Sequence, residues 1–122
     1  AALAVTVDIL GPVIALGTST PVGGAGGYAG PVATIDFNEA VVLVNGALVT
    51  LHDFASSAQL GASISVAGGD LVVTPDIAFS NISADGTSDY YINIGAGAVS
   101  DIAGNLEITG VNGQGGYDFD IA

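Results

Sequence analysis

Apolar and polar residues alternate with a period of two along most of this chain. Between residues 3 and 9 (LAVTVDI) this alternation creates one apolar face, which consists of Leu3, Val5, Val7 and Ile9. A two-residue period is typical of a β-strand with one buried face. A short apolar run follows at 13–16, and comparable apolar stretches predict further strands at 32–37, 41–44, 47–51, 62–66, 70–74, 90–94, 106–111 and 117–121.

Turn-forming residues separate these strands and indicate the fold class. Asn45-Gly46 lies between two apolar runs and predicts a two-residue β-hairpin, while Gly68-Gly69 marks a further turn. Only 53–60 (DFASSAQL) could form a helical turn, with Asp53 as its N-cap. Many short strands with almost no helix predict an all-β fold, an Ig-like antiparallel β-sandwich with an N-terminal strand extension.

The composition changes between residues 17 and 30 (GTSTPVGGAGGYAG), where Gly is frequent and a flexible linker is expected. We therefore expect an N-terminal strand at 1–16, a linker at 17–30 and a β-sandwich at 31–122. The first strand either folds back onto its own sandwich or inserts into a neighbouring subunit. Head-to-tail insertion would generate a filament, with subunit contacts made by Leu3, Val5, Val7 and Ile9.

The charge balance excludes several kinds of partner. The chain has 12 acidic residues, no Lys, no Arg and one His, which gives a formal net charge of −12. Without cations it lacks a phosphate clamp, so nucleic acid is excluded as a partner, as is lysine-dependent catalysis. Twelve carboxylates repel one another unless external cations gather around them, so we expect support from Ca²⁺ in a calcium-rich or saline exterior.

The remaining composition indicates a folded, secreted protein. A mean hydropathy of +0.68 argues against disorder, and no apolar run reaches the roughly 18 residues of a membrane span, so membrane insertion is not expected. The absence of Cys excludes a disulfide framework. Because the chain begins with Ala and lacks a basic n-region, we expect a processed protein located outside the cell or at its surface.

Three motifs in order suggest a family: TIDFNEAV at 34–41, DLVVTPD at 70–76 and DGTSDYYINIGAGAVSDIAGN at 85–105. Over about residues 31–110 the chain resembles the bacterial Ig-like domain of S-layer (SbsA-type) proteins, and Asp-x-Ala-Gly-Asn at 101–105 is the most specific match. The resemblance implies an extracellular spacer or structural unit of surface layers, adhesins and secreted enzymes. The family usually occurs as tandem repeats, whereas this chain has one module, and residues 1–30 and 111–122 lie outside the match.

The candidate ligands for Ca²⁺ lie in two places. Asp101 and Asn105 flank a turn in which their side chains would also bond local backbone groups, and Gly104 tolerates a positive φ. Asp118 and Asp120 share one strand face about 7 Å apart, so solvent or a cation must balance their repulsion. The loop 81–89 is similar to the start of an EF-hand but lacks the closing Glu, and we interpret it as a turn.

No catalytic constellation is evident. His52 is the only imidazole and no GxSxG motif occurs, so we interpret His52 as an ordinary strand-end histidine. Paired carboxylates could hydrolyse glycosides, but without Trp the chain offers little aromatic surface for a sugar. A carbohydrate-binding face would have to consist of exposed Tyr28, Tyr117 and Phe119.

These observations favour a non-enzymatic, extracellular structural subunit. We expect it to polymerise with itself into a surface filament or layer, with N-terminal strand insertion and support from Ca²⁺. The alternatives are a monomeric adhesin or spacer module and a carbohydrate-binding accessory domain.

Overall fold

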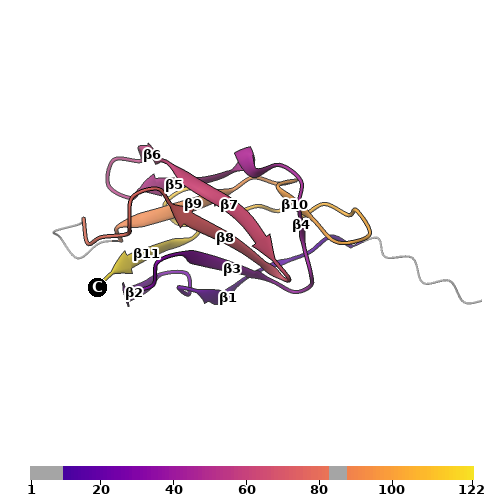
Figure 1. Ribbon diagram of the computed structural model, residues 1–122, viewed down its shortest axis with the longest axis horizontal. Helices are drawn as coiled ribbons and strands as arrows, with labels where there is room; N and C mark the ends of the chain where they lie inside the picture. The colour runs from indigo at the N-terminus through magenta and orange to yellow at the C-terminus, as the bar shows by residue number, and fades with distance from the viewer. Residues whose placement is uncertain (1–9, 83–87) are drawn as a thin grey trace, which may run out of the picture.

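The computed structural model describes residues 10–82 and 88–122, which form an all-β sandwich (Figure 1). One sheet has the order β1-β3-β8-β7 and is antiparallel throughout. Its strands are β1 (Ile14–Thr20), β3 (Ala33–Phe37), β7 (Ala62–Ala67) and β8 (Asp70–Pro75). The predicted β-sandwich is therefore confirmed.

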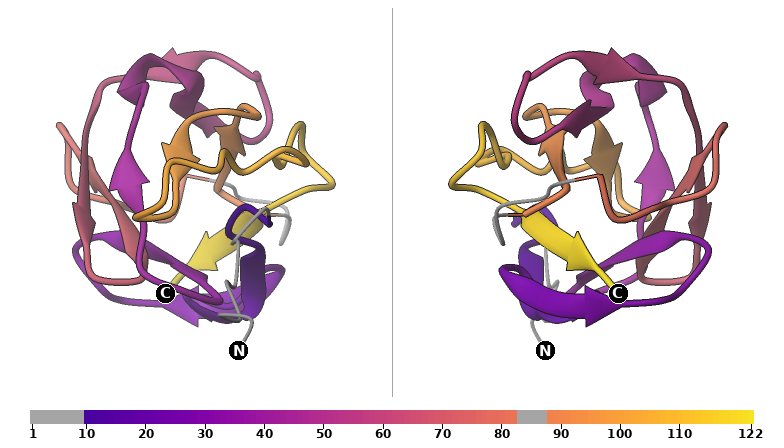
Figure 2. Two further views of the ribbon diagram at one scale, coloured as in Figure 1. Left: turned by 90° about the vertical axis from the view of Figure 1, so that its right-hand side faces the viewer. Right: turned by 90° about the vertical axis from the view of Figure 1, so that its left-hand side faces the viewer.

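The second sheet has five strands in the order β2-β11-β9-β5-β6. These are β2 (Ala25–Tyr28), β5 (Val49–Asp53), β6 (Gln59–Leu60), β9 (Tyr90–Ile94) and β11 (Asp118–Ile121). Only the β11–β2 pairing is parallel among the described strands of this sheet. A small antiparallel pair, β4 (Val42–Leu43) with β10 (Val99–Ser100), lies at one end of the sandwich, near the short 3₁₀ helix η1 (Gly46–Leu48) (Figures 1 and 2).

The core forms where the inner faces of the two sheets meet. The two-residue period holds in β3 and β5, where alternate residues are buried. Phe119 lies at the centre of an aromatic cluster, with ring centroids 5.3 Å from Phe79 and 5.8 Å from Tyr90. The Tyr117 hydroxyl donates to the carbonyl of Pro21 at 2.6 Å, and burial raises the pKa of this phenol. Residues near both ends of the chain thus complete one core.

The segment 17–30 does not behave as the flexible linker that its composition suggests. Strand β1 continues to Thr20, and β2 pairs with β11 at the edge of the second sheet. Ser19 is buried within β1, where its hydroxyl donates to Ala15 O and accepts from Asp36 N. Backbone pairing and buried polar contacts therefore order this segment in spite of its glycines.

Of three further local predictions, two are wrong and one is confirmed. Asn45-Gly46 does not close a two-residue hairpin, because the Asn45 side chain caps η1 and β4 pairs with β10 instead of β5. The helical turn predicted over 53–60 is confirmed as a single turn at its start: Ser57 N donates to Asp53 O at 2.9 Å, and Asp53 Oδ1 accepts from Ser56 N as an N-cap would. The segment 106–111 makes only two isolated bridges, through Leu106 and Val111.

Candidate functional site

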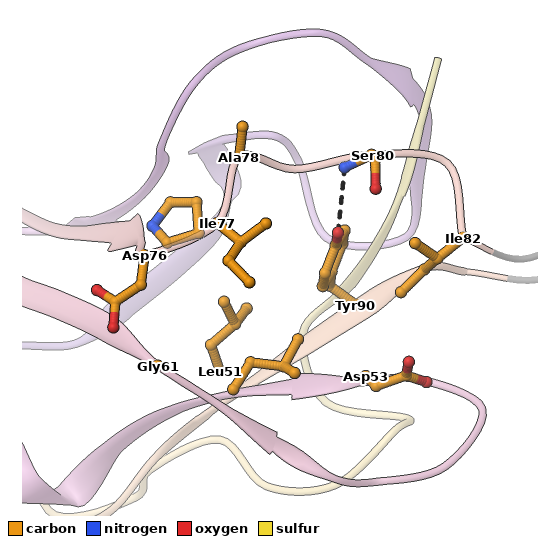
Figure 3. A pocket seen from close by; sticks show the side chains of 11 residues that line it. Leu51, Asp53, Gly61, Asp76, Ile77, Ala78, Ser80, Ile82 and Tyr90 are labelled. Atoms are coloured by element: carbon orange, nitrogen blue, oxygen red, sulfur yellow. Dashed lines mark hydrogen bonds between the residues drawn. The ribbon is translucent and has the colours of Figure 1, made fainter.

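A cavity of about 400 Å³ opens at one end of the sandwich, where β5, β6 and β8 meet the segment 76–82 (Figure 3). We call it the 76–82 cavity. Its lining is largely apolar: Leu51, Leu60, Pro75, Ile77, Ala78, Ile82 and Tyr90, with Gly61, Ser80, Asp53 and Asp76. Figure 3 shows Ile77 above Leu51, with the carboxylates of Asp76 and Asp53 directed outward at two sides. The cavity therefore offers an apolar interior with an acidic rim.

The wall of this cavity, residues 76–82, is held by hydrogen bonds at both ends and is unpaired in between. At its start, Asp76 N donates to Gly61 O at 3.0 Å. Ser80 N donates to the Tyr90 hydroxyl at 3.1 Å, and Ile82 N donates to Asp89 Oδ1 at 2.8 Å. Within the described part of the chain, by contrast, the backbone groups of Ile77 and Ala78 make no hydrogen bond. Ile77 is 86% exposed, a large value for an isoleucine.

Asp89 connects this wall to the sheet. Its side chain is 1% exposed and accepts from Ile82 N and from Ile121 N, the latter at 2.7 Å. Its hydrogen bond to Asp120, followed by burial and charge repulsion, raises the pKa of the Asp120 carboxyl group. Sequence reasoning missed this role, since the strands that meet at Asp89 are distant in the chain.

Asp118 and Asp120, two of the candidate metal ligands, lie on the same face of β11, opposite the buried Phe119 and Ile121. Asp118 accepts a hydrogen bond from the Ser88 hydroxyl, whereas Asp120 is bonded to Asp89. Each of the two carboxyl groups therefore has a hydrogen-bond partner within the protein, and for Asp120 this partner is another carboxyl group.

Asp101 and Asn105 form a self-contained turn. The Asp101 side chain accepts from Asn105 N at 2.8 Å and from Asn105 Nδ2 at 3.0 Å. Gly104 has φ of 93°, the positive value expected from the sequence. Among residues 10–82 and 88–122, no group of three or more His, Cys, Asp or Glu side chains is placed to hold a metal ion. Calcium binding stays a prediction.

Two further acidic features were not evident in the sequence. Glu107 is 1% exposed, and its carboxylate accepts from Thr109 N at 2.7 Å and from Gly110 N at 2.9 Å. Asp36 and Asp70 are directly paired across β3 and β8. A hydrogen bond from Thr18 lowers the pKa of Asp36, while burial and then Asp36 itself raise the pKa of Asp70.

The surroundings of His52 are those of a structural side chain. Its ring stacks on Tyr91 at 4.7 Å, Nε2 bonds the Thr50 hydroxyl at 2.8 Å, and Nδ1 bonds Ser57 O at 3.1 Å. No carboxylate or nucleophilic serine side chain is among these partners. Tyr117 and Phe119 are both fully buried, so they cannot form the exposed aromatic face that carbohydrate binding would require.

The predicted subunit contacts Leu3, Val5, Val7 and Ile9 lie outside the described residues, as do positions 83–87 of the EF-hand-like loop. The start of the described chain, coloured indigo, lies at the β4–β10 end of the sandwich, opposite the end where β8 leads into the segment 76–82 (Figure 1). There a second cavity, of about 410 Å³, is lined by residues 10–13, 38–39 and 106–109. Gly11 lies so close to the carbonyl of Leu106 that a Cβ atom would be only 2.0 Å from that oxygen.

Comparison with known proteins yields no match to a family model, a curated protein or a solved structure. No family is therefore assigned, and the S-layer Ig-like resemblance rests on its motifs alone. No helix in the described ranges is long and apolar enough to cross a membrane.

Proposed function

We propose that this protein is a non-enzymatic, extracellular structural subunit that assembles with itself into a surface filament or layer. The observation that carries the proposal is the presence of exposed apolar surface at both ends of one sandwich. Ile77 and Ile82 lie at one end, and Leu10 and Ile108 lie at the other. Exposed apolar surface of this kind marks interaction sites, and two different ends favour head-to-tail contacts that propagate.

The charge of the chain restricts how such an assembly can be held together. Because Lys and Arg are absent, two copies cannot form Lys or Arg salt bridges with each other. Contacts between copies must therefore use apolar burial, backbone hydrogen bonds or bridging cations, against the mutual repulsion of net charge −12. Calcium ions would reduce this repulsion, which is the role we assign to them.

Light scattering and electron microscopy over a concentration series test the proposal. We expect polymers that grow with protein concentration and that are favoured by Ca²⁺ over a chelator at matched ionic strength. A chain that stays monomeric at millimolar concentration with Ca²⁺ would overturn the proposal in favour of a monomeric spacer or adhesin module.

A further inference from the structure

The 76–82 cavity has the properties of a receptor for an extended strand. We propose that it binds the apolar face of residues 3–9 of a second copy of this chain, with Val5 and Val7 inside the cavity. This inference rests on the proposed function and names the site through which one subunit holds the next.

The size of the cavity suits two aliphatic side chains. A dry, apolar cavity of about 150 Å³ holds a benzene molecule, so the 400 Å³ found here has room for two groups of that size. In a strand, residues i and i+2 point to the same side about 7 Å apart. Val5 and Val7 have this spacing and lie at the centre of the predicted apolar face.

The wall of the cavity also offers backbone groups. Ile77 and Ala78 make no backbone hydrogen bond within the described residues. Because successive residues of an extended segment direct their backbone groups to opposite sides, a peptide strand beside this wall would pair with one of the two. Recognition by strand addition combines such main-chain bonds with pockets for alternate side chains. The cavity and its unpaired wall together provide both elements.

The arrangement of charges is compatible with this occupant. The acidic rim, Asp53 and Asp76, would repel a donor that presented a carboxylate to the cavity (Figure 3). Asp8, the only acidic residue within 3–9, alternates with Val7 and Ile9 and belongs to the opposite face of a strand. An inserted strand would therefore keep its carboxylate away from the cavity.

The chain cannot fill its own cavity in this way. The described chain starts, in indigo, at the opposite end of the sandwich (Figure 1), and a compact domain of this size has a diameter of about 35 Å. Val5 lies five residues before Leu10, so its reach is at most about 18 Å when fully extended. Insertion of Val5 thus requires another molecule, which distinguishes donation from folding back.

Two variants of the full chain separate the donor from the acceptor. Val5→Asp places a charge on the donor strand, with Val22→Asp as a control at an exposed valine outside the cavity. Ala78→Trp introduces a bulky indole into the wall of the cavity in order to block it, with Ala67→Trp as the control on an exposed position of β7. Because the unmodified chain has no Trp, the fluorescence of the single introduced indole reports directly whether the cavity has been filled.

We expect both Val5→Asp and Ala78→Trp to be folded monomers, and both controls to polymerise like the unmodified chain. An equimolar mixture of the two monomers should form dimers and no larger species. In that mixture, only the strand of the Ala78→Trp copy and the cavity of the Val5→Asp copy are intact. A mixture that stays monomeric, or Ala78→Trp chains that polymerise, would overturn the proposed acceptor while leaving the filament function standing.

A peptide of residues 2–10 tests the cavity even if the chain forms no polymers. Added to the Val5→Asp variant, the peptide should bind and raise the melting temperature, and Ala78→Trp should weaken peptide binding at least 10-fold. Equal affinity for the two variants, or no binding to either, would overturn the acceptor site. Peptide binding to a chain that never polymerises would instead overturn the proposed function and retain the site.

Discussion

Replacing Asp89 by Ala gives the most quantitative test of how the cavity wall is held. The substitution removes the acceptor of two backbone N–H groups, those of Ile82 and Ile121. Leaving a buried donor unsatisfied costs about 1–3 kcal/mol. Because Ile121 is only 7% exposed, the cost of leaving its N–H unsatisfied should lie at the upper end of this range. Ile82 is 47% exposed, so water can replace part of its hydrogen bond and the cost should be lower.

The two losses together give an expected destabilisation of about 3–4 kcal/mol for Asp89→Ala. For a chain of this length, that corresponds to a fall in melting temperature of about 12–15 °C. Asp89→Asn keeps one acceptor oxygen and removes the charge beside Asp120, so its loss should be about half as large.

Chemical denaturation at neutral pH, followed by circular dichroism, gives the free energy of unfolding for each variant. Asp76→Ala is the matched control, because Asp76 is an exposed carboxylate on the same segment and surface substitutions usually change stability by less than about 0.5 kcal/mol. A loss below about 1 kcal/mol for Asp89→Ala would refute the reasoning, since it would mean that water satisfies both N–H groups.

Three further predictions follow from local geometry and charge. Gly104→Val should reduce the free energy of unfolding more than His52→Ala, since φ of 93° strongly disfavours a β-branched residue; equal losses in denaturation curves would contradict this. Asp70 and Asp120 have pKa values raised above the ordinary 3.8, so their protonation stabilises the folded state, and this contribution is lost as pH rises through the folded pKa values. The free energy of unfolding should therefore increase as pH falls from neutral towards 3.8, and it should increase less in the Asp120→Asn variant. If the variant shows the same pH profile as the unmodified chain, Asp120 does not contribute to this pH dependence. Below that pH, the lowered pKa of Asp36 acts in the opposite direction. Finally, Ca²⁺ should raise the melting temperature relative to a chelator at matched ionic strength, by mass action on the folded state; identical melts would leave only charge screening.

Alternation predicted the strands whose inner faces meet in the core. Strands β3, β8 and β9 each carry apolar side chains at a two-residue period, and each formed close to its expected bounds. Strand β2 was missed because its sequence, AGGY, offers almost no side-chain pattern. What orders this segment is pairing with β11, which lies about 90 residues away.

Within the candidate site, prediction succeeded where the interactions are local. The turn at 101–105 could be inferred because Asp101 and Asn105 bond each other across four residues. The role of Asp89 could not, since its acceptor geometry depends on Ile121, 32 residues later. The strand predicted at 106–111 does not form, because the Glu107 carboxylate accepts hydrogen bonds from Thr109 N and Gly110 N. Gly110 also has φ of 67°, which is incompatible with a regular strand.

The position of β11 has a consequence for the order of folding. This strand comes last in the described chain, yet it lies inside the five-stranded sheet between β2 and β9. The bond from Tyr117 to Pro21 closes a loop of 96 residues, and such a closure costs about 2 kcal/mol more in chain entropy than one of ten residues. A topology dominated by such distant contacts folds in milliseconds to seconds. A ribosome-bound chain therefore cannot complete the second sheet until Phe119 has left the ribosome. Until then, strands β2 and β9 lack the partner strand that lies between them in the folded protein.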